Sequence, residues 1–159
     1  MKVAGISDIH DSMVNLARLI NNINSRSDIE IVINCGDLLG RAVIEKLAEL
    51  KKEQYVVFSG LDERGDGLAG ACLKAGITCF YDHGEVNAAG KRIGFTHTNS
   101  DAKMMNGFDV VFYGHLHDYR IENIRGCLFV CCGEILGRRI SPCYVVYDTQ
   151  TGEVEKVVI

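Results

Sequence analysis

The chain has 159 residues, 47% of them hydrophobic and 24% charged, with a formal net charge of −4. This length predicts one domain, residues 1–159, that is large enough to bury a core of its own. The mildly acidic balance and the lack of a basic run give no evidence for nucleic-acid binding.

The sequence carries no signal for a membrane or a secretory pathway. No apolar stretch approaches the ~18 residues that a membrane-spanning helix needs, so no membrane association is expected. The N-terminus lacks a charged leader followed by an apolar segment, which favours a cytoplasmic location. The seven cysteines include no C-x-x-C pair, so we expect reduced and mostly buried thiols rather than disulfides or a zinc site.

Apolar strand-like runs alternate with helical spacing through the first half of the chain. Strands are expected at residues 2–7, 30–35 and 54–59, and helices at about 13–23, 43–50 and 68–75. This alternation predicts a parallel sheet with helices packed on it.

The second half of the chain reads mostly as hairpins. Strands are expected at 85–88, 91–96, 109–114, 120–124, 126–132, 144–147 and 154–159, with a short helix at 101–105 capped by Asn99 or Ser100. An α/β beginning and a hairpin-rich end predict two mixed β-sheets packed face to face and flanked by helices, a four-layer α/β/β/α sandwich.

Four short motifs carry the candidate chemistry, each just after an expected strand. They are Asp8-Ile9-His10, Gly36-Asp37, His97 and Gly114-His115-Leu116-His117. They contain four of the five histidines in the chain. Carboxylates and neutral imidazoles bind borderline divalent metals, and ligands of open α/β sheets gather at the carboxyl ends of the strands. The motifs therefore predict a metal site with room for more than one ion.

Each motif alone has a simpler explanation. Asp8 and His10 could form a capped turn before a helix, and Asp37 could be an ordinary turn residue. His115 and His117 could lie on a surface loop. Their order and spacing together favour the metal site.

In that order, D-x-H, G-D, a lone His and G-H-x-H resemble the calcineurin-like metallophosphoesterase superfamily, and above all its compact single-domain phosphodiesterases. The resemblance implies the four-layer metallophosphoesterase sandwich. It also implies a metal-dependent phosphoesterase, either a phosphodiesterase or a small-molecule phosphatase, with a metal-bridging hydroxide as nucleophile. The implied cofactors are two divalent metal ions, with Mn²⁺ expected first and Fe²⁺, Ni²⁺ or Zn²⁺ as alternatives.

The resemblance also implies a role for each motif residue. Asp8, His10 and His117 would hold the first metal, Asp37 would bridge both metals, and His97 and His115 would serve the second metal. The implied partner is a small phosphate ester. No residue is assigned to substrate binding, and the lack of long insertions predicts a shallow site that tolerates different substrates.

One motif of the family is altered in this chain. Gly60-Leu61-Asp62-Glu63 stands where the family shows Gly-Asn-His-Asp or Gly-Asn-Cys-Asp. Leucine cannot coordinate a metal, and the histidine often credited with protonating the leaving group is also absent. Three interpretations stay open: Asp62 replaces the missing ligand, Asp62 is the catalytic general acid, or the second metal binds weakly.

The last interpretation leaves a second function open. The same fold includes a non-enzymatic branch, the retromer scaffold subunit, so the alternative is a weak or inactive phosphoesterase that acts as a protein-interaction scaffold. Retention of four motif histidines favours the enzyme. Exposed sheet edges leave a homodimer as a further alternative.

Three further segments stay outside the predicted ligand set. Arg138-Arg139, the only adjacent arginine pair, is interpreted as a solvated turn. Cys132-Gly133-Glu134 stands where relatives often carry Asn-Pro-Gly-Ser. The rim of the substrate pocket is therefore not inferred from those relatives. Thr98-Asn99-Ser100 follows His97 and could contact a phosphate, although capping of the next helix is the simpler explanation.

Overall fold

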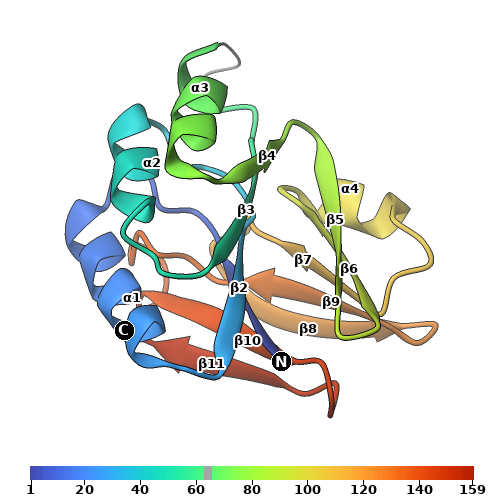
Figure 1. The fold of residues 1–159 in the computed structure, drawn as a ribbon. Coiled ribbons are helices and arrows are strands. Elements are labelled where there is room, and N and C mark those ends of the chain that lie inside the picture. Colours follow the sequence, from blue (N-terminus) through green and yellow to red (C-terminus); the bar gives the residue numbers. More distant parts are fainter. Residues whose placement is uncertain (63–65) are drawn as a thin grey trace.

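The computed structural model describes residues 1–62 and 66–159 (Figure 1). Glu63, the last residue of the altered family motif, lies outside the described residues. The strands are β1 (Lys2–Ile6), β2 (Ile29–Asn34), β3 (Glu53–Val57), β4 (Thr78–Phe80), β5 (His83–Ala88), β6 (Lys91–Thr96), β7 (Val110–Tyr113), β8 (Tyr119–Ile124), β9 (Cys127–Cys132), β10 (Cys143–Asp148) and β11 (Val154–Val158). The helices are α1 (Met13–Ser25), α2 (Arg41–Leu47), α3 (Asp66–Ala75) and α4 (Asn99–Met104).

The strands form two mixed sheets. The first has the order β11-β10-β1-β2-β3-β4, in which β1 to β4 run parallel and the C-terminal hairpin β10-β11 pairs antiparallel at one side. The second has the order β5-β6-β7-β9-β8, in which β6, β7 and β9 run parallel between two antiparallel edge strands.

Helices cover the outer face of each sheet. α1, α2 and α3 lie on the first sheet, and α4 lies against β6, β7 and β9 of the second (Figure 1). Three buried apolar clusters follow this layering: one includes Leu16 and Ile44 beneath the helices, one includes Ile33 and Phe112 between the sheets, and a small one surrounds Ala102 of α4. The predicted four-layer α/β/β/α fold is confirmed.

The sequence pattern explains these layers. α1 buries Leu16, Leu19, Ile20 and Ile23, a spacing that places all four side chains on one helical face. β7 is buried at every position because both faces of the central strand are covered, which accounts for its continuous apolar sequence.

The structure differs from the expectations in a few places. The three-residue strand β4 was not predicted, because so short a segment shows no periodicity. The cap of α4 is Thr98, whose Oγ1 accepts a hydrogen bond from the Asp101 N–H at 3.2 Å, rather than Asn99 or Ser100. All seven cysteines are free thiols, as expected. Among the described residues, no helix is long and apolar enough to cross a membrane.

Candidate metal centre

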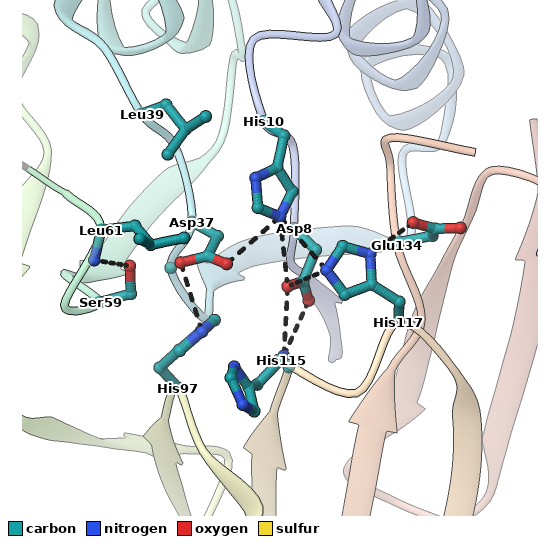
Figure 2. Close-up of polar contacts among 12 residues, drawn as sticks. Asp8, His10, Asp37, Leu39, Ser59, Leu61, His97, His115, His117 and Glu134 are labelled. Atoms are coloured by element: carbon teal, nitrogen blue, oxygen red, sulfur yellow. Dashed lines mark hydrogen bonds and ion pairs between the residues drawn. The ribbon is translucent and has the colours of Figure 1, made fainter. Parts of the chain in front are cut away.

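The predicted metal ligands come together where the parallel strands of both sheets end (Figure 2). Asp8 and His10 follow β1, and Asp37 follows β2 of the first sheet. From the second sheet, His97 directly follows β6, and the loop after β7 carries His115 and His117. The first and second sheets thus contribute opposite sides of one cluster.

Four of these residues form a tight group. Potential ligand atoms of Asp8, His10, Asp37 and His117 all lie within 4.8 Å of one another. His10 Nε2 is 3.2 Å from Asp37 Oδ2, and His117 Nε2 is 3.4 Å from Asp8 Oδ1. The two aspartates are buried and the two imidazoles are partly exposed, so the group opens to solvent on its histidine side.

The other two predicted ligands lie beside this group. His97 Nε2 is 3.3 Å from Asp37 Oδ1, on the side of that carboxylate away from His10 (Figure 2). The His115 ring packs edge-on against the His97 ring, with centroids 5.1 Å apart. His115 also holds the cluster together through its backbone N–H, which lies 3.0 Å from Asp8 Oδ2. Asp37 is therefore the carboxylate that lies between the two groups of histidines.

The proton positions at His97 show what this side of the site can bind. His97 Nδ1 lies 2.7 Å from the Cys35 carbonyl oxygen, which can only accept, so Nδ1 carries the proton. In the neutral form of the ring, Nε2 presents a lone pair to Asp37 Oδ1, a buried oxygen without a hydrogen-bond partner among the described residues. Two facing lone pairs repel, whereas a divalent cation attracts both. The donor set fits a metal ion.

A second imidazole is oriented in the same way. His117 Nδ1 lies 2.6 Å from Oε2 of Glu134, a wholly buried carboxylate. Burial raises the pKa of Glu134, but hydrogen bonds from His117 and from the backbone of Ile140 and Arg139 outweigh it and lower the pKa. Ionised Glu134 accepts a hydrogen bond from the Nδ1–H of His117, and Nε2, which faces Asp8, is then the nitrogen left for a metal. Such carboxylate–imidazole pairs orient metal ligands.

The electrostatics of Asp8 also favour a cation. Burial raises the pKa of Asp8 above its ordinary value of 3.8, because the ionised carboxylate loses its hydration. A positive charge within contact distance stabilises the ionised form and offsets that cost.

Backbone strain is concentrated at the cluster. Five of the six predicted ligands have φ in the left-handed region: Asp8 (55°), His10 (45°), Asp37 (56°), His115 (69°) and His117 (53°). Each such residue costs about 1 kcal/mol, and such strain is held in place only by surrounding contacts. Here the Asp8 N–H donates to the Gly36 carbonyl, and the His10 N–H donates to the Asp37 carbonyl at 3.0 Å. These backbone contacts hold the ligand loops in place.

Gly114 allows the loop after β7 to approach Asp8. A Cβ at this position would lie 1.8 Å from Ser7 Oγ and 2.6 Å from Asp8 Oδ2. Only glycine fits, and its absence of a side chain lets His115 reach the Asp8 carboxylate.

The altered family motif follows β3. Asp62 is buried, and its carboxylate accepts four backbone hydrogen bonds: from Leu38 (2.8 Å), Leu39 (2.9 Å), Ser59 (2.8 Å) and Asp37 (3.2 Å). Both oxygens are therefore engaged in holding the Asp37 loop to the end of β3. The suggested roles of Asp62 as metal ligand or general acid stay predictions, and these hydrogen bonds favour neither role. Leu61 is 64% exposed and offers no donor atom.

Glu134 is the residue of this site that the sequence argument did not assign. It is the second residue after β9, as Asp8 is the second residue after β1. An acidic residue after the apolar run Cys127–Cys132 was the available signal. From the sequence, only the departure of this segment from Asn-Pro-Gly-Ser was noted.

A four-layer α/β sandwich with an aspartate–histidine cluster at its strand ends defines the class of the metallophosphoesterases. Residues 1–152 match the Calcineurin-like phosphoesterase superfamily domain, and the chain belongs to this family. The recognition made from the motifs is confirmed.

Individual proteins show the same likeness. A phosphodiesterase of Methanocaldococcus jannaschii is 28% identical over 170 residues, which cover 100% of this chain and 99% of that protein. The solved structure of an archaeal phosphodiesterase is 26% identical, with a TM-score of 0.90 and full coverage of both chains. Vps29 of Chaetomium thermophilum shares the fold at 16% identity, with a TM-score of 0.71 and coverage of 99% of this chain and 97% of that one.

Proposed function

We propose that the chain is a metal-dependent phosphoric ester hydrolase that cleaves a phosphodiester or a small phosphomonoester. The observation that carries this proposal is the group formed by Asp8, His10, Asp37 and His117, whose ligand atoms lie within 4.8 Å of one another. Divalent metal ions bound there would supply the acidified water that attacks phosphorus and would neutralise charge on the phosphoryl oxygens.

The six predicted ligands would form two adjacent metal sites. Asp37 presents Oδ2 to His10 and Oδ1 to His97, at 3.2 and 3.3 Å, which suits a carboxylate shared by two sites. Asp8 and His117 complete the side of His10, and His115 lies with His97 on the other. Cys35 and Glu134 orient His97 and His117 through their Nδ1 atoms.

The mixed oxygen and nitrogen donors support the expected metals. Mn²⁺ is proposed first, and Fe²⁺, Ni²⁺ and Zn²⁺ suit the same donors, because affinity order alone does not select among them. A cytoplasmic location is proposed as well, supported by seven free cysteines, which a reducing compartment maintains as thiols. The homodimer stays a prediction.

Metal content and hydrolysis measured together test the proposal. The protein is stripped with chelator, reloaded with Mn²⁺, and assayed by elemental analysis and with an aryl phosphodiester. We expect two ions per chain and metal-dependent turnover, and we expect Asp37→Ala to abolish turnover while circular dichroism stays unchanged. Asp82→Asn, an exposed carboxylate in the turn before β5, is the matched control. Full activity of Asp37→Ala would contradict the two-metal arrangement.

A scaffold on the same fold is the second candidate. It is favoured by Leu61, which supplies no ligand at the position where the family has asparagine. One ion or none per chain, no turnover, and partner binding that survives chelation would support the scaffold. Loss of partner binding on chelation would count against a metal-independent one.

A further inference from the structure

Two adjacent arginines lie beside the candidate metal centre. Arg138 and Arg139, between β9 and β10, line a cavity of about 560 Å³ together with His10, His117 and Leu136. The two histidines belong to the four-residue metal group. A molecule held at the metal centre would therefore have the arginine side chains as its immediate neighbours.

A second cavity also borders His117 and Arg139. Its volume is about 500 Å³, and its lining includes Arg139, Arg120, Asp118 and Asn99. Asn99 Oδ1 is buried without a hydrogen-bond partner among the described residues. A rotation of the amide by 180° presents its NH₂ group instead, so this position can serve an acceptor in the cavity.

Within the part of the chain that the structure describes, the arginine pair has no ion-pair partner. Arg120 pairs with Asp118 at 3.4 Å, but among the described residues no carboxylate lies within 4.0 Å of the Arg138 or Arg139 guanidinium. The one hydrogen bond found for the Arg139 guanidinium is a long one, 3.4 Å, to the Leu116 carbonyl. Both groups are exposed and keep donors free for a ligand.

The loop that carries the arginines is held from both sides, unlike an ordinary solvated turn. Glu134 Oε1 accepts hydrogen bonds from the backbone N–H groups of Arg139 and Ile140, while its other oxygen orients His117. Asn15 Nδ2 donates to the Leu136 carbonyl at 3.2 Å. One buried carboxylate thus positions both a metal ligand and the arginine loop, and this preorganisation lowers the entropic cost of binding.

We propose that Arg138 and Arg139 bind a second phosphate of the substrate, beyond the phosphate that is cleaved. The preferred substrates are then phosphate esters that carry an additional phosphate group. The planar guanidinium fork pairs with two phosphate oxygens at once, which makes arginine a suitable residue for this role. This inference rests on the proposed hydrolase function, because the metal centre must hold the first phosphate.

Two chromogenic substrates that differ by one group test the inference. They are thymidine 5′-(4-nitrophenyl phosphate) and the same compound with a 3′-phosphate. KM and kcat are measured for both with the Mn²⁺-loaded wild type, Arg138→Ala/Arg139→Ala and Arg18→Ala. Arg18, exposed on α1, lines neither cavity and controls for the loss of positive charge.

We expect the 3′-phosphate to lower KM of the wild type about tenfold, as a charge-assisted bidentate contact would. The ratio of the two KM values, without and with the 3′-phosphate, should fall close to one in the double variant and persist in Arg18→Ala. Arg138→Lys/Arg139→Lys keeps the charge without the fork and should give an intermediate KM ratio. Equal KM values in the wild type, or a ratio that survives the double substitution, would overturn the inference while the hydrolase stands.

Failure of the proposed function gives a different result. Neither substrate would then be hydrolysed. Calorimetry with thymidine 3′,5′-bisphosphate and thymidine 5′-monophosphate would then test whether the arginine pair binds the second phosphate. Tighter binding of the bisphosphate that the double variant loses supports the arginine site. Equal binding of the two nucleotides overturns it.

Discussion

Glu134 Oε2 lies 2.6 Å from Nδ1 of His117, and the other oxygen of the same carboxylate holds the backbone of the arginine loop. The glutamate is wholly buried, so its charge is present only because these donors surround it. This contact joins the end of β9 to the loop after β7. It also determines which nitrogen of His117 is available to a metal.

Replacing Glu134 by alanine should weaken metal binding through His117. We expect the affinity for Mn²⁺ to fall about ten- to a hundredfold, as found when an orienting partner of a metal ligand is removed. Glu134→Gln retains an acceptor and should lose less. A chelator competition assay measures the affinity, with Glu45→Ala, an exposed residue of α2, as control. An unchanged affinity in Glu134→Ala would show that His117 needs no such partner.

Asp62→Asn should destabilise the fold and loosen the Asp37 loop. The amide introduced by this substitution would turn two of the four backbone contacts of the side chain into donor–donor contacts. Leaving buried donors unpaired predicts a loss of about 2 kcal/mol or more in the free energy of unfolding. Urea unfolding measures it, with Asp82→Asn as control. Wild-type stability together with tighter binding of a second metal would instead support Asp62 as a metal-site residue.

Leu61→Asn restores an amide oxygen at the position where the family carries asparagine. Leu61 is 64% exposed, so stability should change little. If the amide reaches the ion beside His97, the dissociation constant of the second Mn²⁺ should fall about tenfold, a gain of about 1.4 kcal/mol. Leu73→Asn, at an exposed position of α3, is the matched control in the same metal titration. Equal second-metal affinities in both variants would place residue 61 outside the site.

Gly114→Ala and Gly70→Ala should have opposite effects. The new methyl at residue 114 would overlap Ser7 and Asp8, which predicts a loss of about 1–3 kcal/mol and weaker metal binding. A methyl at residue 70, inside α3, meets nothing within 4 Å and should stabilise the helix by about 0.5–1 kcal/mol. Thermal unfolding and metal titration of the two variants check both signs. Full metal affinity in Gly114→Ala would mean that the loop after β7 can move away.

Asp28 should make stability depend on pH in acid. Hydrogen bonds from Arg26 and Lys2 lower the pKa of Asp28 below its ordinary value of 3.8. A lowered pKa in the folded state contributes stability above the unfolded-state pKa, and that contribution is lost as pH falls. The stability difference between wild type and Asp28→Asn should therefore be largest near neutrality and shrink below about pH 4. Urea midpoints across this range measure it, and a difference independent of pH would contradict the ion pairs.

The sequence predicted the fold from features that are local. The continuous apolar sequence of β7 and the four-residue apolar face of α1 report burial directly, because a covered strand or helix face requires those side chains. β4 was missed because three residues carry no periodic signal. The cap of α4 was misplaced by one or two residues because Thr98, Asn99 and Ser100 are all good capping residues.

The sequence by itself determined the family and the strand ends at which the predicted metal ligands lie. It could do so because each motif directly follows a strand, and parallel strands of one sheet end at a common edge. Tertiary structure alone decided what the remaining polar residues contact. Asp62 faces backbone amides, Glu134 faces His117, and the arginine pair lies beside the metal group. The contacts of Asp62 and Glu134 join loops that follow neighbouring strands of one sheet, β2 with β3 and β7 with β9. Packing of the two sheets brings the arginine loop after β9 to the cavity that His10, after β1, also lines.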